Sequence, residues 1–559
     1  DVNVQVIAGF SNRVGGASAG QGNRFGAADF YHVWIYAASL QAYDNTVAGN
    51  TFGFTASTQL IASAGPSAVR ISSASNNVVG GITTGARNYF GGVDTGVSID
   101  GTNARNNRVI GNWFGVKPDG SAAQVNSYGI EIWNARNNEV GGTTTNEGNV
   151  ISGCHAYGVR IFGDYASGNI VQGNLIGTDP TVTFSISNRY AGVDINDGAY
   201  SNRIGATNFQ IYAMNVFAGN AGVGVGIRDS NTFGNIVCFN FFGLTRGGAA
   251  FSNESYGINV YQSPSNQIGP ANYVGNHPTT GINLSGADAV GNRIIGNMVG
   301  MDIIGNYHPN ANGIGSSAPG TIIGGPSTLD RNFIGGNRVN GVDIGTGGHG
   351  SVIQGNLIGL NAFGTGVVSN RQYGIYVLNA NNVVIGGLND ARNIVAGSRL
   401  TGILVAGTSS NTIIAGNYIG TTLDGQTRLG VGTAGIGVDA SHTIVGVPLA
   451  GLGNIIVGAG SAGIAVNHAT NVLIRNNTVG LGADGITNIP NAQGIWVRGS
   501  SRQVQIGGTN SLHANIVARN SGSDVILEGP YDESLVQGNC IGGMNGGVAF
   551  PHGAGGFGI

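Results

Sequence analysis

The sequence predicts an all-β solenoid of stacked coils, on three observations. Short segments, most of them apolar–x–apolar and often preceded by glycine, recur at intervals of 24 to 36 residues. Glycine makes up 102 of the 559 residues, but without the strict Gly-X-Y period of collagen. Helix-forming stretches are almost missing from the chain. A period near 30 residues with short alternating runs is typical of a solenoid, in which each repeat packs on its neighbours.

The recurring segments set the number of coils. Seventeen of them lie between Val33 and Leu527, which predicts about 17–18 coils. They begin at Val33, Val69, Val97, Ile130, Val159, Val193, Val225, Ile258, Ile282, Ile314, Val342, Ile375, Ile403, Ile436, Ile464, Ile495 and Val525.

Within one coil the elements follow a fixed order of three short strands. The segment Gly129–Ile132 gives the first strand, Asn137–Gly142 the second and Asn149–Gly153 the third. Alternating apolar side chains should point into the coil and stack on the coils above and below. Asparagine and glycine fit the corners because left-handed backbone angles cost them least. Asparagines at equivalent corners are expected to bond to one another in ladders.

Longer loops follow the third strand of many coils. Because loops on a rigid scaffold often carry function, their alignment on one edge marks a candidate interaction surface. These loops are Val116–Ser127, Thr178–Tyr190, Leu244–Tyr256, Leu360–Tyr373, Thr421–Ala434 and Leu481–Gln493.

Composition excludes several function classes. Charged residues make up only 9% of the chain and the net charge is −3, so no basic footprint for nucleic acid is present. Apolar runs are too short for a membrane span. Three distant cysteines do not form a disulfide framework and are interpreted as apolar fillers or unpaired thiols. Zinc, calcium and nucleotide motifs are missing, so we expect neither metal nor cofactor.

Charged and aromatic side chains gather at outward positions between residues 100 and 261. This mixture suits a polysaccharide, since aromatic faces stack on sugar rings while carboxylates and guanidinium groups bond hydroxyls. We therefore predict substrate-binding roles for Asp100, Trp133, Arg160, Arg228, Asp229 and Tyr261, and catalytic roles for Glu131, Asp164, Asp194 and Asp197.

Glycoside hydrolysis needs two carboxyl groups at a defined separation. Glu131 and Asp194 lie two coils apart, about 9–10 Å by strand spacing. Asp164 and Asp197 lie one coil apart, about 5 Å if their turns are in register. Arg160, between Glu131 and Asp194, would orient a sugar acid or keep the base ionised.

Plain structural roles compete with these interpretations. Glu131, Arg160 and Asp194 also have the pattern of a cross-strand salt-bridge ladder. Asp-Gly is ordinary turn chemistry. Trp34, Trp133 and Trp496 are either sugar platforms or exposed strand aromatics.

The series Asn-x-Ile-Gly-Gly, Gly-Asn-x-Ile-Gly and Gly-Ile-x-Ile resembles right-handed parallel β-helix proteins, which include pectate-lyase-like enzymes and phage tailspikes. The resemblance implies a right-handed three-stranded parallel β-helix and a homotrimer. It also implies a tailspike-like depolymerase of a bacterial surface polysaccharide, O-antigen or capsule, placed on a virion tail or secreted. The group Asp164, Asp194 and Asp197 resembles the tailspike arrangement of carboxylates on adjacent coils.

Two alternatives stay open. One is a non-enzymatic surface or adhesive rod that presents its loops to a partner. The other is a free secreted polysaccharide lyase, with Arg160 or Arg228 neutralising a uronate and Tyr261 as base. An enzyme should have acids that converge in a groove, whereas a rod should have dispersed acids paired with arginines.

The predicted domain organisation is a β-helix over residues 1–540 and a Gly-rich segment over 541–559. The chain begins at Asp1 and alternates at once through Val2, Val4 and Val6. We expect it to be a mature form or a segment of a larger chain, and secretion remains compatible with it.

Overall fold

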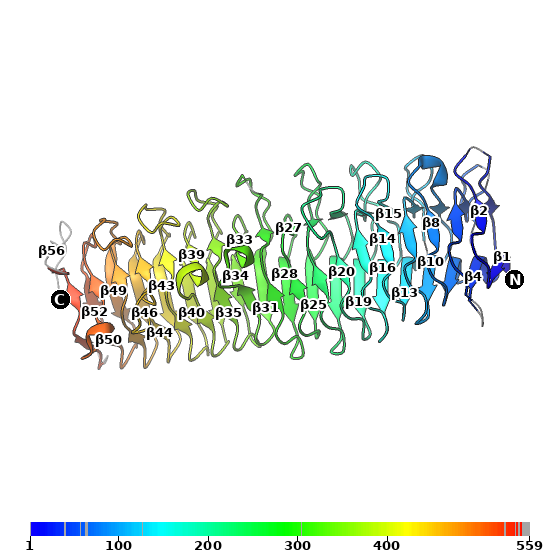
Figure 1. Ribbon diagram of the computed structural model, residues 1–559. Coiled ribbons are helices and arrows are strands. Elements are labelled where there is room, and N and C mark those ends of the chain that lie inside the picture. The colour runs from blue at the N-terminus through cyan, green and yellow to red at the C-terminus, as the bar shows by residue number, and fades with distance from the viewer. Residues whose placement is uncertain are drawn as a thin grey trace. The chain divides into compact units, whose positions relative to one another are not determined.

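The computed structural model shows the stacked parallel strands that the period predicts (Figure 1). The structure describes residues 2–18, 20–37, 41–55, 57–61, 65–125, 127–302, 304–529, 533–542, 544–545 and 548–549. The predicted Gly-rich tail, 541–559, therefore lies mostly outside the described residues. The chain divides into two units, residues 1–278 (unit 1) and 279–559 (unit 2).

Each unit consists of coils that contribute one strand to each of three parallel sheets. Unit 1 contains nine coils. Its sheet 1 contains β1 (Val2–Ile7), β4 (Tyr31–Tyr36), β7 (Ser67–Ser72), β10 (Thr95–Asp100), β13 (Tyr128–Trp133), β16 (Tyr157–Phe162), β19 (Ala191–Asn196), β22 (Val223–Arg228) and β25 (Ile258–Tyr261). Its sheet 2 contains β2 (Arg13–Gly15), β5 (Thr46–Ala48), β8 (Val78–Gly80), β11 (Arg108–Ile110), β14 (Glu139–Gly141), β17 (Ile170–Gln172), β20 (Arg203–Ile204), β23 (Ile236–Val237) and β26 (Gln267–Ile268). Its sheet 3 contains β3 (Arg24–Phe25), β6 (Thr51–Phe52), β9 (Tyr89–Phe90), β12 (Trp113–Phe114), β15 (Val150–Ile151), β18 (Leu175–Ile176), β21 (Asn215–Phe217), β24 (Asn240–Phe242) and β27 (Tyr273–Val274).

Unit 2 repeats this plan with nine further coils. Its sheet 1 contains β28 (Thr280–Ser285), β31 (Asn312–Ser317), β34 (Val342–Ile344), β37 (Ile375–Leu378), β40 (Ile403–Ala406), β43 (Ala434–Asp439), β46 (Ala462–Asn467), β49 (Gln493–Arg498) and β52 (Val525–Leu527). Its sheet 2 contains β29 (Arg293–Ile294), β32 (Ile322–Gly324), β35 (Val352–Gln354), β38 (Val384–Ile385), β41 (Ile413–Ile414), β44 (Ile444–Val445), β47 (Leu473–Ile474), β50 (Gln505–Gly507) and β53 (Leu535–Gln537). Its sheet 3 contains β30 (Met298–Val299), β33 (Phe333–Ile334), β36 (Leu357–Ile358), β39 (Ile394–Val395), β42 (Tyr418–Ile419), β45 (Ile455–Ile456), β48 (Thr478–Val479), β51 (Ile516–Val517) and β54 (Cys540–Ile541).

The remaining elements of the described residues are short. β55 (Met544–Asn545) and β56 (Val548–Ala549) pair antiparallel. The 3-10 turns are η1 (Thr84–Ala86), η2 (Thr328–Asp330), η3 (Asn389–Ala391) and η4 (Ser511–His513). The predicted all-β solenoid and its number of coils are confirmed.

The inward residues of the strands form the core. On sheet 1, Val33 and Ile35 are fully buried, and Val69 and Ile71 stack on them from the next coil. In sheet 3 of unit 1, the buried rings of Phe52, Phe90 and Phe114 stack with centroids 4.9 and 4.5 Å apart. Because each coil contacts only its neighbours, this core has no centre and is a column of like residues.

Buried asparagine ladders connect the coils at the corners, as expected. At the corner between sheets 2 and 3 of unit 1, the backbone and side-chain nitrogens of Asn174 donate to Oδ1 of Asn215, each over 3.0 Å. The same ladder runs through Asn23, Asn50, Asn88, Asn112, Asn149, Asn174, Asn215, Asn240 and Asn272. These bonds satisfy corner amides that no strand partner reaches.

The two units differ at the corner between sheets 1 and 2. Unit 1 carries a second ladder there, which includes Asn138, Asn169 and Asn202. At that corner in unit 2, Thr412 and Thr443 are buried instead. Hydroxyl groups are too short to reach the next coil, and the Thr443 hydroxyl donates to Ala440 O of its own coil at 2.9 Å.

Hairpin loops interrupt every second coil after sheet 3. Antiparallel bridges close them at Phe54–Leu60, Val116–Ala122, Thr178–Ser185, Leu244–Ala250, Met301–Tyr307, Leu360–Val367, Thr421–Arg428 and Leu481–Asn488. Six of these eight hairpins lie in the loops expected from the sequence; those beginning at Phe54 and Met301 are additional. In unit 2 successive hairpins touch, since Leu423 N donates to Gly364 O over 3.2 Å and Ala483 N to Gly425 O over 2.9 Å.

Asp179 stabilises one of these hairpins through hydrogen bonds, so removing its carboxylate should change the stability by an amount that depends on pH. Its carboxylate accepts hydrogen bonds from the backbone of Thr181, Thr183 and Phe184, at 2.9, 2.6 and 2.8 Å. Burial acts to raise the pKa, but the hydrogen bonds prevail and lower the pKa of Asp179 to about 2. The folded-state pKa lies below the unfolded value, so the stabilisation is present above about pH 4 and is lost as pH falls towards 2.

We expect Asp179→Ala to lower the free energy of unfolding by about 2 kcal/mol at pH 7. Urea denaturation of the wild type and the variant at pH 7, 4 and 2.5 measures the difference, which should shrink at the lowest pH. Asp119→Ala is the matched control, because Asp119 also lies in a hairpin but its carboxylate is fully exposed. A difference for Asp179→Ala that does not depend on pH would contradict the assignment.

Candidate functional site

The outward residues of sheet 1 in unit 1 form two columns that cross the strands. The middle column contains Trp34, Arg70, Ser98, Glu131, Arg160, Asp194, Gly226 and Asn259. The end column contains Tyr36, Ser72, Asp100, Trp133, Phe162, Asn196, Arg228 and Tyr261. Because strand side chains alternate, both columns face away from the core. Glu131, Arg160 and Asp194 therefore occupy consecutive coils, in the predicted order.

Glu131 is a carboxyl group without an ion-pair partner within 4.0 Å in the part of the chain that the structure describes. Burial raises its pKa, the charge of Arg160 lowers it, and the carboxylates of Asp100 and Asp94 raise it further. The net shift is upward. Glu131 thus holds a proton at a higher pH than an ordinary glutamate, which is what a general acid requires.

Asp194 has a different environment. It is 3% exposed, and both of its oxygens accept from Arg228: Nε lies 3.1 Å from Oδ1 and Nη2 lies 3.0 Å from Oδ2. Burial raises the pKa of Asp194 and the hydrogen bonds of Arg228 lower it, with a net shift upward; the pKa of Arg228 is raised by the same contact. The bidentate geometry favours the ionised pair. Gly226 lies beside Asp194 on the next strand. A Cβ at this position would lie only 3.2 Å from Oδ1 of Asp194, so glycine leaves room for the carboxylate.

Arg160 contacts neither carboxylate directly. Its Nε donates to Oδ1 of Asn196 and its Nη1 to the hydroxyl of Tyr128, both over 3.3 Å. Its guanidinium carbon lies 4.1 Å from the centre of the Phe162 ring. The salt-bridge ladder Glu131–Arg160–Asp194 therefore does not form among the described residues, since the arginine that pairs with Asp194 is Arg228.

Aromatic rings border this region. Trp133 and Phe162 stack with centroids 6.1 Å apart, and Trp133 is 45% exposed. Tyr128 and Tyr157 stack at 6.0 Å on the other side of the middle column. Tyr261, 49% exposed, lies next to Arg228 in the end column.

Asp100 belongs to a separate ion pair. Nε of Arg70 lies 2.8 Å from Oδ1 of Asp100, and the hydroxyl of Ser72 donates to the same oxygen at 2.9 Å. Arg70 Nη1 also donates to the hydroxyl of Tyr31. At this end of the two columns the acid and the arginine are paired, as in the structural salt-bridge ladder considered above.

The three turn carboxylates are not equivalent. Asp164 lies against Gly198, the residue after Asp197, and is thus displaced by one residue from Asp197. Asp197 and Asp229 are in register, and the backbone N–H of Asp197 donates to Oδ2 of Asp229 over 3.1 Å. The separation of about 5 Å considered for Asp164 and Asp197 required turns in register, and these turns are not.

Sequence reasoning missed Tyr128 and Tyr157, which contact Arg160 and Arg228. The hydroxyl of Tyr157 accepts from Nη2 of Arg228 at 3.4 Å. A signal was available, because Tyr-Gly stands directly before the strand pattern in both coils. Burial and the charge of Asp194 raise the pKa of Tyr157.

Two findings concern other site types. Within the described residues no group of three or more His, Cys, Asp or Glu side chains is arranged to hold a metal ion. In the same residues, no helix has the length and apolar character needed to cross a membrane. Cys154 and Cys238 are buried free thiols, and burial raises the pKa of Cys238 to about 11.

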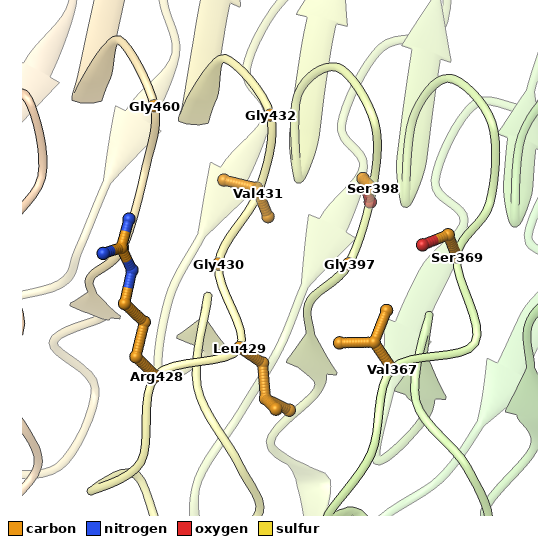
Figure 2. A pocket seen from close by; sticks show the side chains of 11 residues that line it. Val367, Ser369, Gly397, Ser398, Arg428, Leu429, Gly430, Val431, Gly432 and Gly460 are labelled. Atoms are coloured by element: carbon orange, nitrogen blue, oxygen red, sulfur yellow. The ribbon is translucent and has the colours of Figure 1, made fainter.

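Unit 2 contains a hollow of about 490 Å³ at the corner between sheets 3 and 1 (Figure 2). Five of its eleven lining residues are glycines, and Val367 and Leu429 are contributed by two hairpin loops. Arg428 is its charged residue, and its side chain packs against Gly458. The lining contains no carboxylate.

No protein-family model and no curated protein matches the chain. A solved structure of the periplasmic alginate epimerase AlgG is 11% identical, with 80% of this chain and 77% of that chain covered and a TM-score of 0.30. The mannuronan C-5 epimerase AlgE6 A-module of Azotobacter vinelandii is 12% identical, with 96% and 90% covered and a TM-score of 0.21. PfbA, a surface adhesin of Streptococcus pneumoniae, is 9% identical, with 74% and 84% covered and a TM-score of 0.27. These values are too low to transfer an activity to this chain.

Proposed function

We propose that the outward face of sheet 1 in unit 1 binds a bacterial surface polysaccharide, O-antigen or capsule, and cleaves its glycosidic bonds. The observation that carries the proposal is Glu131, a half-buried carboxyl with a raised pKa and no ion-pair partner in the described chain. It lies between the stacked rings of Trp133 and Phe162 and those of Tyr128 and Tyr157.

Binding follows from the chemistry of the two columns. The exposed ring of Trp133 offers a face to sugar C–H groups, and Tyr261 offers a second ring. Arg160 keeps donors free for hydroxyl or carboxylate groups, and Asp197 and Asp229 supply acceptors at the turns. The polysaccharide lies across the coils, because the columns do.

Cleavage uses two carboxyl groups. Glu131 donates its proton to the glycosidic oxygen as the bond from that oxygen to the anomeric carbon breaks. Asp194, kept ionised by Arg228, takes a proton from a water molecule whose oxygen bonds to the anomeric carbon. Two strand spacings separate the carboxyl-bearing residues by about 9–10 Å, which is near the upper end of the range for inversion and well beyond that for retention. Asp164 and Asp197 remain candidates for the second carboxylate, tested by Asp164→Asn and Asp197→Asn.

The experiment is incubation of the purified protein with a panel of lipopolysaccharides and capsular polysaccharides, followed by mass analysis of the products. Discrete oligosaccharides that have gained water support the proposal. Products without added water, with an unsaturated end, identify a lyase, in which Arg160 or Arg228 neutralises the uronate and Tyr261 is the base. Light scattering tests the homotrimer that the tailspike resemblance implies.

A second candidate function is non-catalytic binding by a surface rod. The pairing of Asp100 with Arg70 and of Asp194 with Arg228 favours it, because acids dispersed in ion pairs are what such a rod requires. Polysaccharide retention without products, unchanged in Glu131→Gln, would establish this alternative and reject the cleavage proposal.

A further inference from the structure

The outward face of sheet 1 in unit 2 contains a second concentration of polar and aromatic groups. Its middle column carries small or apolar residues over three coils, Leu404, Gly437 and Ala465, before Trp496. Trp496 lies in β49, and Arg498 follows it on the same strand. A hollow of about 640 Å³, here called the Trp496 hollow, is lined by Asn467, Trp496, Arg498, Gly499, Glu528 and Gly529.

The side chains of the Trp496 hollow hold one another in place. Nε1 of Trp496 donates to Oε2 of Glu528 over 2.8 Å, which fixes the plane of the indole ring. The guanidinium carbon of Arg498 lies 4.6 Å from the ring centre. Trp496 packs against a buried cluster of Ala434, Ala462 and Ala465, which supports the ring. A fixed ring loses little conformational entropy when a ligand binds.

The polar groups are not consumed by ion pairs. In the described part of the chain, no carboxylate oxygen lies within 4.0 Å of a nitrogen of Arg498. Arg498 and the amide of Asn467 can donate to a ligand, and Glu528 keeps one oxygen free to accept. Glycines 499 and 529 leave the floor without side chains.

The Trp496 hollow carries no excess of positive charge. Asp439 lies next to Asn467 in the column that leads to Arg498, and burial raises its pKa while Arg498 and His468 lower it. Arg498 thus faces the carboxyl groups of Asp439 and Glu528, with His468 nearby. A strongly anionic ligand would meet two acids beside one guanidinium group. Donors, acceptors and an aromatic ring without net positive charge fit a neutral sugar.

We propose that the Trp496 hollow is a second carbohydrate-binding site, which takes neutral pyranose units of a polysaccharide. Trp496 contacts the C–H face of the sugar, and Asn467, Arg498 and Glu528 bond its hydroxyls. The site binds without cleaving, and it is independent of the proposed site in unit 1. Binding at one site and cleavage at the other are therefore separable.

The test uses the full chain and affinity electrophoresis in gels that contain dextran, mannan or a mixed-linkage β-glucan, with polygalacturonate as the acidic comparison. We expect retardation by at least one neutral polymer and a loss of about tenfold in affinity in Trp496→Ala. Arg498→Gln should weaken binding as well, and Trp496→Phe should retain part of it. Thermal midpoints of the variants verify that they are folded.

Phe363→Ala is the matched control, since it removes an exposed aromatic ring of unit 2 outside the hollow and should leave this retardation unchanged. Wild-type affinity in both Trp496→Ala and Arg498→Gln would overturn the proposal. Retardation by polygalacturonate alone, or by none of the polymers, would do so too. Failure of the unit 1 proposal would appear instead as missing products.

Discussion

Glu131→Gln should lower the rate of polysaccharide cleavage by a factor of about 10² to 10⁴, the usual contribution of a general acid. Glutamine keeps the shape of Glu131 but has no acidic proton to give to the leaving oxygen. Affinity for the polysaccharide should change little, because the side chain retains its contacts. The measurement is oligosaccharide release by the wild type and the variant at saturating substrate.

The pH profile gives this prediction a second readout. Burial raises the pKa of Glu131, and the acid must be protonated to act, so cleavage by the wild type falls as pH rises through this raised value. The alkaline limb of the profile should therefore lie at a higher pH than the ordinary glutamate pKa of 4.5. This limb should be missing from the residual activity of Glu131→Gln. Glu254→Gln, on an exposed loop of unit 1, is the control and should behave as wild type. Wild-type rates in Glu131→Gln would remove the catalytic assignment.

Arg228→Leu should destabilise unit 1 by about 3–5 kcal/mol at pH 8, because the variant leaves the carboxylate of Asp194 buried and unpaired. The wild-type residue supplies two hydrogen bonds to Asp194, at 3.0 and 3.1 Å. Burial already raises the pKa of Asp194, and without these hydrogen bonds it rises further above its unfolded value. The folded variant then needs a proton on Asp194. Its stability is therefore full below the unfolded-state pKa of Asp194 and is lost as pH rises through the folded-state pKa.

Urea denaturation at pH 4.5 and pH 8 measures this effect, and the destabilisation should be smaller at pH 4.5. The double variant Asp194→Leu/Arg228→Leu should regain most of the loss, because no buried charge remains. Arg136→Leu, an exposed arginine of the same unit, is the control. Equal destabilisation of Arg228→Leu at both pH values would show that its contribution is packing and not the ion pair.

The fold followed from the sequence because a solenoid repeats its local rules. Each coil carries its own apolar pairs, and the corner asparagines mark the turns, so every coil is an independent indication of the same plan. Asparagine ladders were expected at the corners and are present. Their replacement by Thr412 and Thr443 in unit 2 is visible in the sequence once the corner position is known.

The site was harder to predict because side-chain reach is not set by strand register. Arg160 lies between Glu131 and Asp194 in the middle column. The residue that bonds to Asp194 is nevertheless Arg228, which lies in the end column on the next coil. A long arginine can bond a diagonal neighbour, and a stack of rings holds Arg160 elsewhere.

The register of the turns, by contrast, is encoded in simple residue offsets. Asp197 and Asp229 each follow the start of their strand segments, Val193 and Val225, by four residues. Asp164 follows Val159 by five residues. These offsets pair Asp197 with Asp229 and leave Asp164 one residue out of step, so this part of the site was predictable from the sequence.

One corner ladder of unit 2 has a gap. At the corner between sheets 3 and 1, Asn310, Asn337 and Asn370 are linked, and Asn491 and Asn520 are linked further on. Between them the same position holds Ser398, Val431 and Ala459, as the backbone bonds from Gly432 to Ser398 and from Gly460 to Val431 show. The hydroxyl of Ser398 is buried and has no hydrogen-bond partner among the residues that the structure describes.

In a linear array of coils, the free energy of opening depends on the interfaces between neighbours, and the weakest interface separates cooperative segments. The gap lies beside the hollow of Figure 2, where glycines replace side chains on the outer wall. Unit 2 should therefore open first between β39 and β45, with coils on either side retaining their amide protection. Under force or partial denaturation, this unit would come apart as two blocks, with the ladder gap as their boundary.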